Sequence, residues 1–165
     1  MKEISPLDFN ENIFKLIGKD WFLVTANDGN KTNMMTASWG GMGVLFNKNV
    51  VKIYVRPSRY TKTFIDKSEK FSLCVLPENY RDALAYCGKV SGRDEDKISK
   101  TGLTVSNISD CSVFNESKIA FVCKKLYSQL MDANLLIDEK LRDTFWKEDV
   151  HVMYIAEIKK ILVNE

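Results

Sequence analysis

Two long strand-like segments near the C-terminal end, residues 119–131 and 150–162, constrain the fold more than any other feature of the chain. As a pair of long antiparallel strands they would close a barrel. The earlier strand-like segments are joined too often by hairpins for a doubly wound parallel sheet, whose strands need long crossover connections. The pattern therefore predicts a mainly β fold, a small barrel with peripheral helices.

Four shorter strand-like segments lie in the first half of the chain, at residues 21–26, 31–38, 50–55 and 71–76. The Asp28-Gly29 pair between the first two supplies the positive-φ residues of a tight hairpin. Helices are expected near residues 10–17, ending at Gly18, after Arg59, from Pro77 to Gly88, and at residues 138–145. No repeat or low-complexity linker interrupts this pattern, so residues 1–165 are expected to form a single domain.

Composition excludes several classes of protein. The 24 basic and 22 acidic residues are mixed along the chain, so no polybasic stripe for nucleic acid is present. The N-terminus lacks the apolar core of a signal peptide and no segment approaches the length of a transmembrane helix, so we expect a cytoplasmic protein without membrane contact. Four widely spaced cysteines and one histidine encode neither a metal site nor a disulfide framework, and the cysteines are expected to be buried thiols.

The segment Val55-Arg56-Pro57-Ser58-Arg59-Tyr60-Thr61 carries the chemistry of a phosphate site. An apolar strand ends at Pro57, and a helix is expected to open near Ser58 or Tyr60. A helix start leaves amide donors unpaired and carries partial positive charge, while guanidinium groups recognise phosphate through paired hydrogen bonds. The alternative is an ordinary capped helix with surface arginines.

Three segments, taken in order and spacing, resemble the flavin reductase-like, FMN-binding split-barrel family, which includes the flavoredoxins. They are Asn33-Met34-Met35-Thr36-Ala37-Ser38-Trp39-Gly40, the segment 55–61, and Cys87-Gly88-Lys89-Val90-Ser91-Gly92-Arg93-Asp94-Glu95-Asp96-Lys97. Residues 149–158 are similar to the closing strand of the family, although Ala156 stands where relatives often have glycine. Residues 104–118 carry no recognisable signature.

The resemblance implies a six-stranded split β-barrel that forms a homodimer and holds one FMN per subunit. It assigns the phosphate to Arg56, Ser58, Arg59, Tyr60 and Thr61. It places Met35, Thr36, Ala37, Ser38 and Trp39 along the isoalloxazine ring, and Gly88, Ser91, Gly92 and Lys97 close to the cofactor. Without the resemblance, residues 33–39 would be read as an ordinary edge strand with Trp39 in the core, and residues 91–97 as a solvated, capped helix start in which Ser91 or Asp94 is the cap.

The implied function is that of an FMN-binding oxidoreductase, an NAD(P)H-dependent flavin reductase that passes hydride through bound FMN to a small acceptor. The alternative is a flavoredoxin-type electron carrier that exchanges electrons with a partner protein and binds no nicotinamide. No Gly-x-Gly-x-x-Gly follows a strand, so NADH or NADPH would have to stack on exposed flavin. A third possibility is another ligand such as pyridoxal phosphate or haem. His151 is a candidate general acid, with a packing or interface role as the alternative.

Overall fold

The computed structural model describes residues 1–147 and 149–164. In this part of the chain the strands are β1 (Lys2–Ile4), β2 (Phe22–Asn27), β3 (Thr32–Ala37), β4 (Gly40–Leu45), β5 (Lys48–Val55), β6 (Lys70–Val75), β7 (Val105–Ile108), β8 (Cys111–Phe114), β9 (Ile119–Leu130) and β10 (Val152–Val163). The α-helices are α1 (Ile13–Lys15), α2 (Tyr60–Lys67), α3 (Arg81–Lys89), α4 (Lys97–Thr101) and α5 (Glu139–Phe145). A π-helical turn, η2 (Leu16–Asp20), extends α1, and the 3-10 turns are η1 (Pro6–Asp8), η3 (Glu78–Tyr80) and η4 (Ala133–Leu135).

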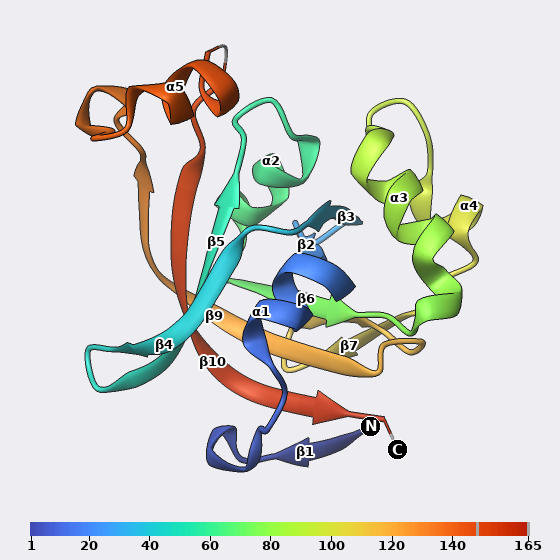
Figure 1. The fold of residues 1–165 in the computed structure, drawn as a ribbon. Coiled ribbons are helices and arrows are strands. Elements are labelled where there is room, and N and C mark those ends of the chain that lie inside the picture. The colour runs from blue at the N-terminus through green and yellow to red at the C-terminus, as the bar shows by residue number, and fades with distance from the viewer. Residues whose placement is uncertain (148, 165) are drawn as a thin grey trace.

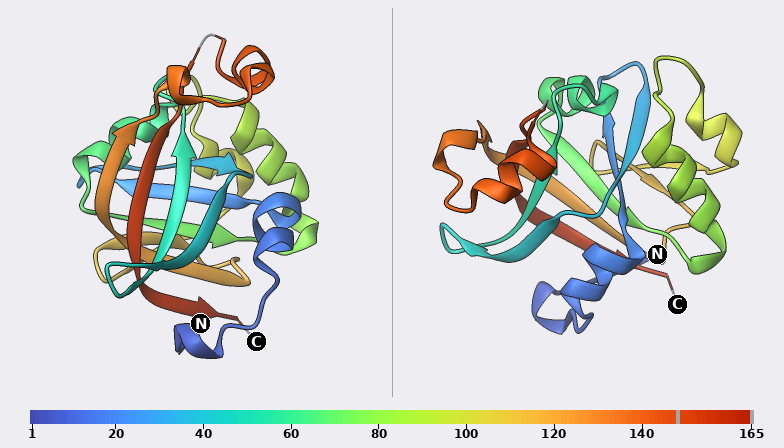
Figure 2. Two further views of the ribbon diagram at one scale, coloured as in Figure 1. Left: turned by 60° about the vertical axis from the view of Figure 1, so that its left-hand side comes forward. Right: turned by 45° about the horizontal axis from the view of Figure 1, so that its top comes forward.

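The main sheet is built on the two long C-terminal strands, as the sequence predicts. Its order is β3-β2-β6-β9-β10-β5-β4, all pairs are antiparallel, and β1 adds to β10. Register shifts between β9 and β10 at Ile155/Ala156 and Ile158/Lys160 let these strands bend and serve both halves of the barrel. Figure 1 shows β2, β3 and β6 to the right of β5 and β10, and the left view of Figure 2 shows them crossing steeply behind these two strands. The mainly β fold with peripheral helices is confirmed.

All six strands expected from the sequence are present, and the structure adds β1, β4 and the β7–β8 hairpin. β4 escapes sequence reasoning because three of its six residues are glycine, which weakens the strand signal. One of them is required by packing, since a Cβ at Gly40 would lie 2.6 Å from the carbonyl oxygen of Lys52 on the paired strand β5. The N-terminal helix continues past Gly18 to Asp20.

The barrel is split between β3 and β4, which follow each other in the chain yet lie at opposite edges of the sheet. Only Ser38 and Trp39 connect them. Three Cα–Cα steps of 3.8 Å span at most about 11 Å, so the two edges must approach each other at this point. The short connection therefore fixes the place at which the sheet fails to close.

Two groups of buried side chains hold the sheet in shape. The larger fills the barrel and includes Phe22, Phe71, Phe121 and Tyr154. The smaller lies between the sheet and α3 with the β7–β8 hairpin, and contains Cys74, Cys87 and Cys111. All four cysteines are buried, as predicted. Within residues 1–147 and 149–164, no helix is long and apolar enough to cross a membrane, and no group of His, Cys, Asp or Glu side chains could hold a metal ion.

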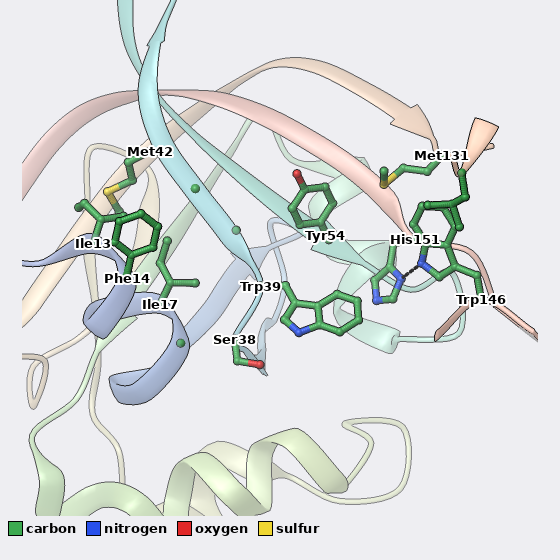
Figure 3. A pocket seen from close by; sticks show the side chains of 14 residues that line it. Ile13, Phe14, Ile17, Ser38, Trp39, Met42, Tyr54, Met131, Trp146 and His151 are labelled. Atoms are coloured by element: carbon green, nitrogen blue, oxygen red, sulfur yellow. Dashed lines mark hydrogen bonds between the residues drawn. The ribbon is translucent and has the colours of Figure 1, made fainter. Parts of the chain in front are cut away.

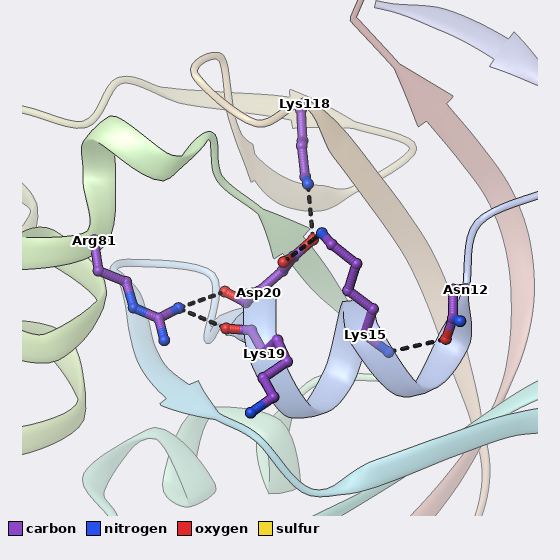
Figure 4. Close-up of polar contacts among 6 residues, drawn as sticks. All are labelled: Asn12, Lys15, Lys19, Asp20, Arg81 and Lys118. Carbon is purple, nitrogen blue, oxygen red and sulfur yellow. Dashed lines mark hydrogen bonds and ion pairs between the residues drawn. The ribbon is translucent and has the colours of Figure 1, made fainter.

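Polar contacts fasten the N-terminal helix to the sheet (Figure 4). The Asp20 carboxylate accepts hydrogen bonds from Lys15 at 2.8 Å and from Lys118 at 2.9 Å, and these two ammonium groups hold its pKa below the usual value against the opposing effect of burial. Arg81 donates to the carbonyl oxygen of Lys19 at 2.7 Å and lies 3.5 Å over the Trp21 ring. These contacts set the position of α1 and η2 next to the split.

Candidate functional site

A cavity of about 430 Å³ opens at the split of the barrel. Its walls come from the end of β3, the connection to β4, the end of β5 and the loop before α2. The lining residues are Met35, Thr36, Ala37, Ser38, Trp39, Tyr54, Arg56, Ser58, Arg59 and His151. All except Tyr54 are residues for which the sequence predicts a role at the cofactor, so the fold brings these predicted residues together.

One end of this cavity is cationic. Arg56 is exposed and Arg59 is half-buried, and Arg59 donates to the carbonyl oxygen of Gly88 at 2.7 Å. Burial, with a smaller contribution from the charge of Arg56, lowers the pKa of the Arg59 guanidinium. Among the described residues, no carboxylate forms an ion pair with either arginine. Two neighbouring guanidinium groups without a counter-ion are suited to an anion such as phosphate.

Ser58 connects this cationic end to two residues that the sequence did not assign. Its hydroxyl donates to the Asp149 carboxylate at 2.5 Å, and its carbonyl oxygen accepts from Arg93 at 3.2 Å. The Arg93 guanidinium also lies 4.7 Å from the centre of the Tyr60 ring. Arg93 therefore adds a third cation beside the start of α2. Its position could not be found from sequence spacing, because it depends on how the loop of residues 90–96 folds back onto α2.

Thr61 and Gly92 lie behind this surface. Thr61 is buried, and its hydroxyl accepts a hydrogen bond of 3.1 Å from the buried side chain of Asn33. A Cβ at Gly92 would lie 2.3 Å from Oδ1 of the same asparagine. A Cβ at Gly88 would lie 3.4 Å from Cβ of Thr36. Gly92 thus allows the loop after α3 to approach β3 closely, whereas a Cβ at Gly88, within α3, would make an ordinary van der Waals contact. The Thr61 hydroxyl already accepts a hydrogen bond inside the protein.

Lys97 and Ser91 hold the same loop in place. The Lys97 side chain is buried, and its ammonium donates to the carbonyl oxygens of Met34 and, at 3.3 Å, Cys87. Burial lowers its pKa to about 8. The Ser91 hydroxyl accepts from the backbone N–H of Arg93 at 3.2 Å. Neither Ser91 nor Asp94 caps α4, because Asp96 accepts the N–H groups of residues 98 and 99.

β3 presents one free backbone edge to the cavity. It pairs with β2 on one side, and in the described part of the chain it is the terminal strand of the sheet. The Thr36 hydroxyl donates to the carbonyl oxygen of Leu84 at 2.5 Å, so this side chain is used in packing α3. An unpaired strand edge offers N–H and C=O groups in alternation, which suits a planar ligand with donors and acceptors along one edge.

His151 closes the cavity opposite β3 (Figure 3). It is buried, its ring centre lies 5.0 Å from that of Trp39, and its Nδ1 accepts a hydrogen bond of 3.0 Å from Nε1 of Trp146. Burial and the nearby charge of Arg56 lower the pKa of His151, against the opposing effect of Asp149. The imidazole is therefore neutral at pH 7. Trp39 is 41% exposed rather than packed in the core.

Comparison with known proteins agrees with this fold. The family profile of the flavin reductase like domain matches residues 15–165. No curated protein matches the chain. The fold is a split barrel, and the chain belongs to the flavin reductase like domain family.

Solved structures share the fold at low sequence identity. Flavoredoxin from Methanosarcina acetivorans has a TM-score of 0.72 and 20% identity over 98% of this chain and 77% of its own. An FMN-binding domain of a flavin reductases-like enzyme from Shewanella baltica OS155 has a TM-score of 0.71 and 15% identity. The match covers 97% of this chain and 75% of that domain. A protein from Shewanella frigidimarina NCIMB 400, described as a flavin reductase with a split barrel domain, has a TM-score of 0.71 and 18% identity. The match covers 93% of this chain and 73% of that protein.

Proposed function

We propose that this chain binds FMN in the cavity at the split of the barrel and acts as an oxidoreductase. The phosphate would lie between Arg56 and Arg59 at the start of α2, with Ser58 and Tyr60 beside it. The isoalloxazine ring would lie along the free edge of β3 from Met35 to Ser38. Bound FMN would supply the two-electron chemistry, while these residues bind the cofactor and fix its orientation.

One observation carries this proposal. Arg56 and Arg59 lie at a helix start without an ion-pair partner among the described residues, directly beside a strand edge with unused hydrogen-bonding groups. A phosphate monoester joined to a flat ring with alternating donors and acceptors satisfies both features at once. Pyridoxal phosphate and haem fit less well, because Lys97 is buried against two carbonyl oxygens and His151 is hydrogen-bonded to Trp146.

For the reaction we propose that NADH or NADPH donates hydride to the bound flavin, which then reduces a small acceptor. Family membership supports this choice. In this reaction His151 would keep one face of the site closed to water by packing between Trp39 and Trp146. The neutral imidazole retains a proton on Nε2 and can donate a hydrogen bond, which fits an orienting role better than that of an acid.

A second candidate is an electron carrier without nicotinamide turnover. It is favoured by the absence of a Gly-x-Gly-x-x-Gly motif and by relatives in structure that are named flavoredoxins. The two candidates share the cofactor site and differ in their electron partners, which are a nicotinamide and a small acceptor for the enzyme and a partner protein for the carrier.

Two measurements test these proposals in order. The first is the visible absorbance spectrum of the purified protein, with the released chromophore identified by mass after denaturation. Release of FMN is expected, and a colourless protein that takes up no added FMN would contradict the cofactor assignment. The second is anaerobic reduction of the FMN-loaded protein by NADH and by NADPH. Bleaching by either supports the enzyme, whereas bleaching only by chemical reductants supports the carrier.

We also propose a homodimer. Large apolar side chains are exposed at the turn between β4 and β5 and near the end of β9, including Val44, Phe46 and Leu130. A second copy that covers them would remove this apolar surface from water. Light scattering of the eluting protein tests the assembly, and a monomer at every concentration would contradict it. The cytoplasmic location stays a prediction from the sequence.

A further inference from the structure

A larger cavity, of about 770 Å³, adjoins the proposed FMN site (Figure 3). One part of its wall comes from α1 and η2, with Phe14 and Ile17, and from Met42 on β4. The other part carries aromatic side chains, including Trp39, Tyr54 and Trp146. Its volume lies within the roughly 300–1,000 Å³ of small-molecule sites, which are also mainly apolar.

No lysine, arginine, aspartate or glutamate lines this cavity in the described part of the chain. The cofactor cavity, in contrast, is lined by Arg56 and Arg59. A molecule that carries a phosphate or pyrophosphate would have to give up hydration in the larger cavity without a cationic partner, which is unfavourable. The larger cavity therefore selects an uncharged, apolar occupant.

The two cavities are continuous, because Ser38, Trp39, Tyr54 and His151 line both. An occupant of the larger cavity would thus contact the same side chains as the cofactor. The Trp39 ring provides a flat, partly exposed surface at this boundary, on which a planar molecule can stack.

The shared wall offers hydrogen-bond donors. The Trp146 indole N–H can only donate, so Nδ1 of His151 must be the acceptor and the proton of the neutral ring must be on Nε2. Nε2 of His151 and the hydroxyl groups of Ser38 and Tyr54 have no hydrogen-bond partner among residues 1–147 and 149–164. Carbonyl oxygens of a ligand, which only accept, complement such donors.

We propose that the larger cavity binds an uncharged aromatic dione of the quinone class as the electron acceptor of this protein. The proposal rests on the proposed function, because the quinone gains two electrons and two protons from the fully reduced flavin, giving hydroquinone and oxidised FMN. The binding part of the proposal concerns only the residues of this chain and can be measured without turnover.

The test measures binding of 2-methyl-1,4-naphthoquinone to the oxidised, FMN-loaded protein by equilibrium dialysis. Met42→Glu places a carboxylate in the larger cavity but not in the cofactor cavity. Leu7→Glu introduces the same charge on η1, at a side chain that is 88% exposed and outside the lining. We expect the wild type and Leu7→Glu to bind the quinone equally, Met42→Glu to bind it at least about tenfold more weakly, and all three to retain the same FMN affinity.

Equal quinone binding by the wild type and Met42→Glu, or none by a wild type that binds FMN, would overturn the proposal. Quinone binding that appears only when a dimer is diluted to monomers would also overturn it, since a second copy would then cover the cavity. If Met42→Glu does not fold, Phe14→Glu takes its place, because Phe14 is 89% exposed and tolerates the change. If FMN is not bound but quinone binds with the same dependence on Met42, the cofactor proposal fails and the cavity assignment stands.

Discussion

Lys97 directs its ammonium group at the backbone carbonyl oxygen of Met34. This contact ties the edge strand β3 to the loop after α3, and the second bond to Cys87 ties the same amine to the helix end next to Gly88. The carbonyl oxygen of Gly88 in turn accepts a hydrogen bond from the Arg59 guanidinium. The buried lysine therefore supports the arrangement of the proposed phosphate site, although it does not itself face the cofactor cavity. Its role is to position other groups.

The first prediction concerns the pH dependence of stability. Burial lowers the pKa of Lys97 to about 8, from a usual value of 10.5. Between these two values the folded protein has lost the proton while the unfolded chain still holds it, so the unfolding free energy should rise with pH across this window. The neutral amine keeps two N–H groups, enough for both carbonyl oxygens. Urea unfolding at both ends of the window measures the change.

Lys97→Met provides the comparison for this measurement. It lacks the titrating group, so the gain in unfolding free energy on going from about pH 8 to about pH 10.5 should be smaller in the variant than in the wild type. The same slope in both proteins would show that the ammonium is not destabilised by burial.

The second prediction concerns Gly92. In Gly92→Ala the new Cβ would meet Oδ1 of Asn33 at 2.3 Å, and this side chain is buried and held by its bond to Thr61. Relief requires a shift of the loop, at a cost of about 1–3 kcal/mol in unfolding free energy, and FMN affinity should fall because Arg93 moves with the loop. Chemical denaturation and FMN titration measure the two effects.

Gly18→Ala is the matched control. A Cβ at Gly18 meets nothing within 4 Å, and the residue lies in the π-helical turn η2. The same substitution should therefore be neutral or stabilise the protein by up to about 1 kcal/mol. A loss of stability in Gly18→Ala as large as in Gly92→Ala would mean that the predicted contact with Asn33 is not the cause.

The strands and the residues around the cavity could be predicted from the sequence because their signals are local. Six strand-like segments and the arginines of residues 55–61 can be recognised without knowledge of the fold. The family resemblance then predicts how the strands are arranged and which residues line the site. Whether those residues hold FMN stays a prediction. β4 was missed because Gly40, Gly41 and Gly43 hide a strand that only its pairing with β5 defines.

Side-chain roles that depend on tertiary contacts could not be predicted in the same way. The sequence places Lys97 near the cofactor, but only the packing of α4 against β3 shows that two carbonyl oxygens use its ammonium. Asp149 follows the α5 region, far from Ser58 in the chain, and the two meet because β10 pairs with β5. Contacts between residues so far apart in the chain leave no pattern in the spacing of residues within either segment, so they cannot be predicted from the sequence.

The third prediction concerns Arg59. Arg59→Ala removes a charge-assisted hydrogen bond to the proposed phosphate, which is worth about 1.5–3 kcal/mol. FMN affinity should fall accordingly, while the affinity for riboflavin, which has no phosphate, should change much less. Lys100→Ala removes the same charge from an exposed position on α4 and should leave both affinities unchanged. An equal loss for FMN and riboflavin would show that Arg59 acts on the shape of the site and not on phosphate.

The fourth prediction has the opposite sign. The Asp149 carboxylate accepts a hydrogen bond from the Ser58 hydroxyl, which a bound phosphate would otherwise receive. The negative charge of Asp149 also repels an anion at the proposed phosphate site. Asp149→Asn should therefore strengthen FMN binding by about 1 kcal/mol at low ionic strength, and less as salt screens the interaction. Riboflavin binding is again the control. A weaker FMN affinity in this variant would instead assign Asp149 to positioning Ser58 for the phosphate.

The fifth prediction uses the fact that His151 is the only histidine in the chain, so NMR should detect one titrating imidazole. Burial, together with Arg56, lowers its pKa below the usual 6.5. As pH falls below 6.5, the unfolded chain takes up the proton first, so this group makes the folded state progressively less stable until the folded imidazole titrates as well. Protonation of Nδ1 also breaks the bond from Trp146.

Two tryptophan variants separate the hydrogen bond from burial. Trp146→Phe removes the donor that favours the neutral imidazole, so the midpoint of the His151 titration should move up toward the usual value. Trp21→Phe makes the same substitution at a ring that packs under Arg81 and does not contact His151, and it should leave the midpoint unchanged. If Trp146→Phe leaves the midpoint low, burial and Arg56 alone lower the pKa, and Trp146 serves only to close the cavity.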